Sequence, residues 1–187
     1  VSGSLMKWLR DQMQLFENTK ETQAMAESVE NTNGVYIVPA FVGLGAPYWD
    51  DACQASILGL TFGANKNHIV RAALESMAYQ SKDVLDAMKQ DSQINISSLK
   101  VDGGAAANDF LLQFQSDLLQ MPVQRFKTNE LTALGAAYLA GLSCGYWTHE
   151  ELGVDLQKEF VPEKTSKEMD QLYSNWKKAV KTCQSYK

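Results

Sequence analysis

The residues best suited to chemistry lie in one short stretch, where an apolar run meets Asp102, Gly103 and Gly104, with Asn108 close behind. A helical pattern begins directly after the glycines, which predicts a strand-to-helix turn. Paired glycines permit positive φ and let another group approach the backbone closely. The first amides of a helix favour a polar or anionic ligand. The pattern therefore indicates a nucleotide contact at the end of a strand, although a tight turn with no ligand explains it equally well.

Two familiar nucleotide motifs are missing from the sequence. No G-x-G-x-x-G follows the predicted strand, and no G-x-x-x-x-G-K-[ST] occurs anywhere in the chain. The sequence thus favours neither a dinucleotide-binding turn nor a P-loop, and a nucleotide at Gly103 and Gly104 requires another scheme.

The elements that position this turn alternate between strand and helix patterns, which predicts an α/β layered domain without repeats or internal linkers. Capping-box signals mark three helix starts, at Asn18 with Glu21, at Thr148 with Glu151 and at Thr165 with Glu168. We expect helices at residues 3–16, 18–29, 66–89, 105–121 and 133–144, and strands at residues 35–38, 56–62, 99–102 and 123–126.

Three local patterns allow more than one interpretation. Tyr48 and Trp49 lie in a glycine- and proline-rich loop, where they either line a cleft or, as we prefer, plug the core. The i,i+4 charge pairs that include Glu75 predict a solvated helix face. The stripe of small residues within 133–144 fits either a helix at a domain crossover or one packed tightly in an ordinary core.

Composition excludes several classes of function. The chain has 187 residues and a net charge of −5, without a basic stripe, which argues against nucleic-acid binding. No apolar run approaches the roughly 18 residues of a membrane span, and no signal-peptide pattern follows Val1, so we expect a cytoplasmic protein. The cysteines lack C-x-x-C spacing and the two histidines lack partners, which predicts free thiols and no metal site: Cys53, Cys144, Cys183, His68 and His149.

Several runs resemble one protein family over nearly the whole chain. The segment from Gly59-Leu60-Thr61 through His68 to Glu75 resembles the second signature of the FGGY carbohydrate kinases. The strings Gly-Ala-Pro-Tyr-Trp-Asp at 45–50 and Thr-Ala-Leu-Gly-Ala-Ala-Tyr-Leu-Ala-Gly at 132–141 resemble the glycerol kinase branch of that family.

The resemblance implies an actin-like ATPase (ribonuclease H-like) fold, with ATP held in a cleft between two domains. Residues 1–187 are then the C-terminal, nucleotide-binding domain, and residues 165–187 form a C-terminal helix packed on it. Matched positions imply nucleotide contacts at Gly3, Lys7, Gly104 and Asn108, with Gly103 in the same turn. Lys7 departs from the family's usual glutamine, although a lysine also reaches a phosphate as a point charge.

The resemblance further implies Mg²⁺-assisted transfer of the γ-phosphoryl group of ATP to glycerol. The catalytic aspartate, the glycerol contacts and one phosphate-binding turn are expected upstream of Val1, so we expect no catalytic residue here and no activity from this chain alone. We expect the complete enzyme to be a homo-oligomer. Two alternatives stay open: a kinase for another polyol or sugar, and a non-catalytic actin-like nucleotide-binding module. An aspartate-bearing domain upstream of Val1 excludes the second.

Overall fold

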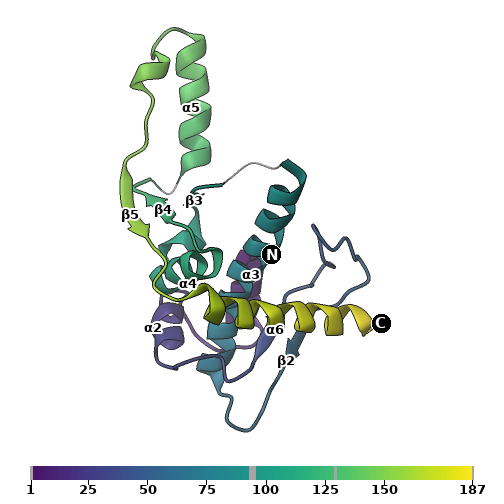
Figure 1. Ribbon diagram of the computed structural model, residues 1–187. Coiled ribbons are helices and arrows are strands. Elements are labelled where there is room, and N and C mark those ends of the chain that lie inside the picture. The colour runs from purple at the N-terminus through teal and green to yellow at the C-terminus, as the bar shows by residue number, and fades with distance from the viewer. Residues whose placement is uncertain (1, 93–95, 129, 187) are drawn as a thin grey trace.

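The computed structural model describes residues 2–92, 96–128 and 130–186, which form helices interleaved with short strands, as predicted (Figure 1). In chain order the elements are α1 (Ser2–Asp11), α2 (Glu21–Glu27), β1 (Tyr36–Val38), β2 (Ser56–Leu58), α3 (Lys66–Ser92), β3 (Leu99–Val101), the 3₁₀ helix η1 (Gly104–Ala107), α4 (Asp109–Leu119), β4 (Val123–Phe126), α5 (Leu131–Ser143), the 3₁₀ helix η2 (His149–Glu151), β5 (Leu156–Phe160) and α6 (Ser166–Ser185).

The strands form two small sheets. β1 and β2 pair antiparallel, while β3 pairs parallel with β4 and β4 pairs antiparallel with β5. The sequence did not predict β5, because Phe160 is its one buried side chain and the strand therefore lacks the apolar alternation of a half-buried strand. The three-stranded sheet carries the candidate turn at the end of β3.

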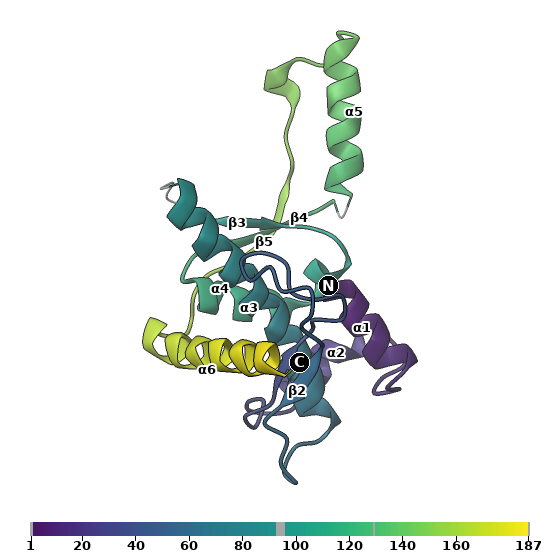
Figure 2. The ribbon, with the colours of Figure 1, turned by 90° about the vertical axis from the view of Figure 1, so that its right-hand side faces the viewer.

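Helix α3 forms the centre of the core, where it contacts α4, α2, β1 and α1 (Figure 2). Val70, Ala73 and Met77 are buried along the predicted stripe, and Trp176 of α6 stacks on Tyr79 with 5.3 Å between ring centroids. The stripe prediction fails at its C-terminal end, where Val84 is 38% exposed, because the helix there extends beyond the core.

Several predicted elements are shorter than expected, and two of them end early because the backbone turns. The helix predicted at 3–16 ends at Asp11, and Gln14 adopts a φ of +52° as the chain folds back. The strand predicted at 56–62 ends at Leu58, because Gly59 adopts a φ of +80° against the backbone of Gly34.

Two side-chain predictions are wrong. Glu75 is not on a solvated face: its side chain pairs with Arg71 at 2.9 Å but is buried beneath it, where Tyr79 also donates to it. Trp49 does not plug the core, since it has a φ of +50° and is 79% exposed, whereas Tyr48 packs partly buried against the core as expected.

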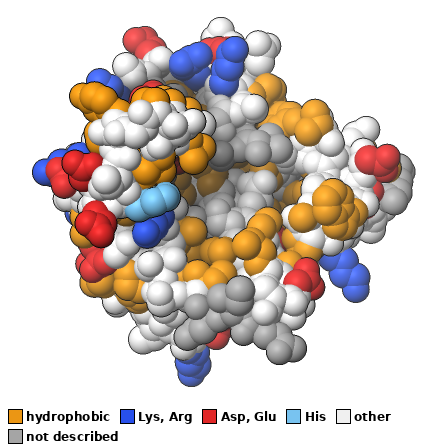
Figure 3. Space-filling view, turned by 90° about the horizontal axis from the view of Figure 1, so that it is seen from above, with side chains coloured by type: hydrophobic (Ala, Val, Ile, Leu, Met, Phe, Trp, Pro, Cys, Tyr) orange, Lys and Arg blue, Asp and Glu red, His pale blue; other side chains and the backbone are white. Residues whose placement is uncertain are grey.

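Helix α5 projects away from the rest of the described chain, together with η2 and the start of β5 (Figures 1 and 2). It begins at Leu131 rather than Ala133, and Gly141 is its one buried residue, which lies against Trp147. The small-residue stripe is thus not packed in an ordinary core. Seen from above, hydrophobic side chains surround a hollow beside this projection (Figure 3).

The cysteines form no disulfide. Cys53 and Cys183 are nevertheless buried together, with 2.9 Å between their Sγ atoms, so the end of α6 packs on the loop before β2. Within the described ranges, no helix has the combination of length and apolar character needed to cross a bilayer.

Candidate functional site

One cavity of about 430 Å³ collects three of the predicted residues. Gly3 comes from α1, Gly104 from η1, and Asn108 from the junction between η1 and α4. The remaining wall comes from α1, α2 and the segment that leads into it, α3 and η1, and is formed by Met6, Thr19, Lys20, Thr22, Gln23, Leu74, Met77, Ala105 and Ala107. The cavity thus combines an apolar floor with polar groups on one side, as small-molecule sites usually do.

The two adjacent glycines have different tasks. Gly103 adopts φ +83° and ψ 177°, a conformation that is essentially restricted to glycine. Gly104 has no such restriction, and a Cβ built on Gly104 or on Gly3 meets no heavy atom within 4 Å. Gly103 therefore shapes the turn, while Gly3 and Gly104 leave the wall of the cavity bare.

The prediction that α4 begins directly after the glycines is wrong. The 3₁₀ turn η1 intervenes, and α4 begins at Asp109. The cause is the extended backbone of Asn108, at φ −91° and ψ 106°, which interrupts the helix and places this residue at the N-cap of α4. The free amides of a helix start therefore lie beyond Asn108 rather than at Gly104.

The side chain of Asn108 is already held within the protein. Its Oδ1 accepts from the amide of Leu111 at 3.0 Å, and its Nδ2 donates to Thr22 Oγ1 at 3.2 Å. A primary amide has two N–H donors and two acceptor lone pairs, so these bonds fix the orientation of Asn108 and leave one donor and one acceptor for another partner.

The structure does not bring every predicted residue to the cavity. Lys7 is exposed, lies one helical turn after Gly3 on α1 and is not among the lining residues. Gly103 also stays outside the lining and contributes through the backbone alone.

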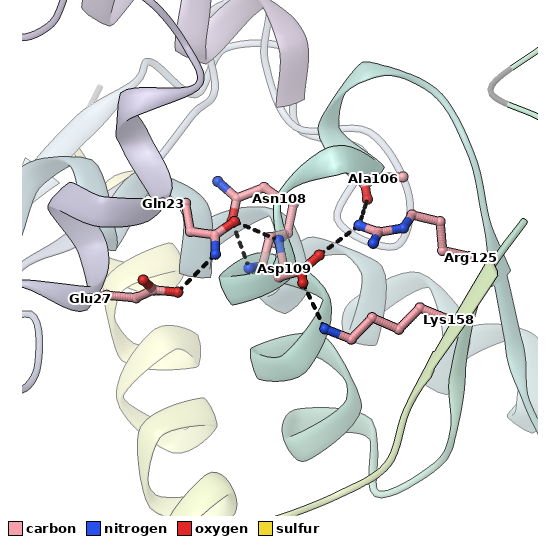
Figure 4. A network of polar contacts seen from close by, with 8 residues as sticks. Gln23, Glu27, Ala106, Asn108, Asp109, Arg125 and Lys158 are labelled. Carbon is pink, nitrogen blue, oxygen red and sulfur yellow. Dashed lines mark hydrogen bonds and ion pairs between the residues drawn. The ribbon is translucent and has the colours of Figure 1, made fainter. Parts of the chain in front are cut away.

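Sequence reasoning missed the polar residues of α2. Gln23 Oε1 accepts from the amide of Asp109 at 3.0 Å, and Gln23 Nε2 donates to Glu27 at 3.0 Å (Figure 4). Thr22 is buried and contacts Asn108 across 86 positions of sequence. No local spacing signals either contact, since both depend on α2 packing beside the N-terminus of α4.

A charged cluster lies behind the turn, also shown in Figure 4. Asp109 pairs through Oδ1 with Arg125 and through Oδ2 with Lys158, both at 2.7 Å. Burial raises the pKa of Asp109, but the hydrogen bonds from Lys158 and Arg125 outweigh it, and the pKa is lowered from its ordinary value. This carboxylate is thus kept ionised beside the turn. On the other face of the turn, Ala105 and Asp102 line a second cavity of about 470 Å³.

Comparison with known proteins places this arrangement in a family. The family model of the FGGY carbohydrate kinases, C-terminal domain, matches residues 1–144. A glycerol kinase of Bacillus velezensis is 54% identical over 190 residues, covering 100% of this chain and 38% of its own length. A glycerol kinase of Aeromonas salmonicida is 54% identical over 183 residues, covering 96% and 37%. The chain therefore spans less than two fifths of the length of these curated relatives.

Solved structures agree. The crystal structure of Plasmodium falciparum glycerol kinase with ADP superposes with a TM-score of 0.88 at 36% identity, covering 97% of this chain and 37% of that one. A xylulose kinase from Rhodospirillum rubrum has a TM-score of 0.78 at 23% identity, which shows the common fold. These matches confirm the resemblance and the actin-like fold inferred from the sequence. The chain belongs to the FGGY family of carbohydrate kinases, and its residues 1–144 correspond to the C-terminal domain of that family.

Proposed function

We propose that this chain is the C-terminal, nucleotide-binding half of a glycerol kinase, which transfers the γ-phosphoryl group of ATP to glycerol and yields glycerol 3-phosphate. One observation carries the proposal: Gly3, from the start of the chain, meets Gly104 and Asn108 of the glycine turn at one cavity whose glycine wall has room for a ligand. The glycerol kinases found as relatives, one of them crystallised with ADP, support the choice of substrate and nucleotide.

The chain's own residues bind and orient the nucleoside. The bare backbone at Gly104 and Gly3 admits a flat base or a ribose, where side chains would collide. Met6, Leu74 and Met77 form an apolar floor that excludes water from the base. The remaining donor and acceptor of Asn108 select the orientation of the nucleoside.

The phosphoryl-transfer chemistry belongs to groups outside this site. Bound Mg²⁺ neutralises charge on the transferring phosphates. The residues here hold the nucleoside, and, as the family resemblance implies, we assign the catalytic base and the glycerol contacts to the rest of the enzyme. We further propose that residues 1–187 form one domain that ends in the helix of residues 165–187. We also propose that the complete enzyme is cytoplasmic and homo-oligomeric.

Calorimetric titration of the complete kinase with ADP tests the site. Gly104→Val should abolish ADP binding, because the two added methyl groups occupy the cavity while the Cβ meets no protein atom within 4 Å. Gly153→Val is the matched control, since Gly153 is exposed, equally unobstructed and absent from the cavity lining. Undiminished ADP affinity in Gly104→Val would overturn the assignment.

Lys7 requires its own test, because it lies outside the cavity lining. We propose that its ammonium group reaches a phosphate of the nucleotide rather than the nucleoside. Lys7→Met should then weaken ADP binding several-fold and leave adenosine binding unchanged. Equal effects on both ligands, or none on either, would exclude a phosphate contact.

A further inference from the structure

We propose that Arg125 and Lys158 act through Asp109 as positioning residues for the nucleotide turn. The turn comprises Gly103 to Asn108, and the three charged residues lie beside it (Figure 4). This inference rests on the proposed function, because it concerns how the same site is held ready for its ligand.

Arg125 links the turn to the start of α4 with one nitrogen atom. Its Nη1 donates to the carbonyl of Ala106 at 3.0 Å and to Asp109 Oδ1 at 2.7 Å. Ala106 belongs to η1 and Asp109 is the first residue of α4, so Asn108 lies between two points fixed by the same guanidinium. The side chain of Arg125 is 13% exposed, and water therefore competes little for these bonds.

Asp109 is held from two sides. Lys158 of β5 donates to its Oδ2 at 2.7 Å, while Gln23 of α2 accepts from its backbone amide at 3.0 Å. The sheet thus fixes the side chain of Asp109 and α2 fixes its backbone. Charge-assisted hydrogen bonds of this length are among the stronger ones in proteins, and they leave the neighbouring Asn108 little freedom to rotate.

The contacts of Arg125 with the turn leave one donor of its guanidinium without a partner. Arg125 Nε is buried and makes no hydrogen bond within the described part of the chain. A buried donor without a partner is unfavourable. The position of Arg125 therefore favours the two hydrogen bonds from Nη1 over a hydrogen bond from Nε. A turn fixed before the ligand arrives loses less entropy on binding, which is the advantage that this arrangement provides.

An ion pair just outside strands β4 and β5 allows this positioning role to be tested separately from ordinary stabilisation. Lys127 and Asp155 pair at 3.1 Å, but their side chains are 65% and 77% exposed and contact neither the turn nor the cavity. An exposed pair of this kind contributes little. Lys127→Met therefore removes a cation and an ion pair from the end of β4 without touching the turn.

The experiment measures ADP affinity and steady-state kinetics of the complete kinase carrying Arg125→Met, Arg125→Lys, Lys158→Met or Lys127→Met. Arg125→Met should raise the Kd for ADP and the KM for ATP about five- to tenfold, while kcat at saturating ATP and the KM for glycerol stay unchanged. Arg125→Lys should recover part of the loss through Asp109. Lys158→Met should raise the Kd about two- to threefold, and Lys127→Met should not change it.

Hydrogen exchange distinguishes a local loosening of the turn from a loss of global stability, because it reports the turn and α6 separately. Amides of residues 103–111 should exchange faster in Arg125→Met, while those of α6 keep their wild-type rates. If Arg125→Met fails to fold, Lys158→Met decides, because its side chain is 48% exposed and tolerates replacement. ADP affinity at the wild-type level in the folded variants would overturn the inference while the loss in Gly104→Val upholds the nucleotide site. Absence of ADP binding in the wild type would overturn both.

Discussion

Asp83 is the residue whose replacement should damage the fold most among the polar positions of α3. It is 3% exposed and accepts three hydrogen bonds from α6: from Tyr173 Oη at 2.6 Å, from Trp176 Nε1 at 2.8 Å and from Lys177 Nζ at 3.0 Å. A single carboxylate thus anchors α6 to the central helix, and Asp83→Ala removes that anchor.

The expected loss of stability depends on whether each donor finds another partner once the carboxylate of Asp83 is removed. Trp176 is 1% exposed, so its indole N–H stays buried without a partner, at about 1–3 kcal/mol. The charge-assisted bond from Tyr173 is lost as well, at about 1.5–3 kcal/mol. Lys177 contributes little, because its side chain is 44% exposed and it keeps its bond to Tyr48. We expect Asp83→Ala to lower the free energy of unfolding by about 3–5 kcal/mol.

Urea denaturation followed by tryptophan fluorescence measures this loss, at equal m values for the variants compared. Asp83→Asn keeps the volume and one acceptor and should cost less, about 1–3 kcal/mol. Asp86→Ala is the control, since Asp86 is 34% exposed and pairs with Lys82 at 3.2 Å, which predicts a loss below about 1 kcal/mol. The reasoning is refuted if Asp83→Ala and Asp86→Ala lower the free energy of unfolding equally.

Three further predictions use the same denaturation assay. Gly103→Ala should lower the free energy of unfolding by about 1–3 kcal/mol because of the φ of +83° at this position, whereas Gly104→Ala should lower it far less. Equal losses would contradict the conclusion that Gly103 shapes the turn and Gly104 does not. Gly141→Ala should lose about 1–3 kcal/mol, because its Cβ would clash with the ring of Trp147, and an unchanged stability would contradict that packing. Burial raises the pKa of Glu75, so its contribution to stability is full at low pH and is lost as pH rises through the folded pKa. The stability of the wild type relative to Glu75→Gln should therefore fall with rising pH, and a rise would refute the direction.

The sequence predicted most of the features that depend on neighbouring residues. The capping boxes at Thr148 and Thr165 are formed as expected, whereas Lys20 rather than Asn18 occupies the N-cap position of α2. The i,i+4 pair of Arg71 and Glu75 is also formed. Each of these contacts joins residues within one helical turn, so spacing alone determines whether they meet. The glycine turn was found for the same reason, because the conformational freedom of glycine is a local property.

Burial of charged residues was not predictable in this way. Glu75 was predicted to lie on a solvated helix face, yet it is buried, and so is Asp83 of the same helix. Asp83 is covered by α6, whose Trp176 lies 93 positions later. Thr22 and Gln23 reach the site through a comparable separation of 86 positions. Helical periodicity says which face a residue occupies, but not which distant element covers that face.

Two cations near the end of β4 show which feature of the site could not be predicted from the sequence. Arg125 and Lys127 are two positions apart, so strict strand alternation predicts the same face and the same environment for both. In the structure the pairing of β4 with β5 shifts register between Arg125 and Phe126, and β4 ends at Phe126. Arg125 therefore turns toward Asp109 and the nucleotide turn, while Lys127 pairs in solvent with Asp155. Local sequence is sufficient to find the turn, but the register of a strand that the sequence did not reveal decides which cation holds it.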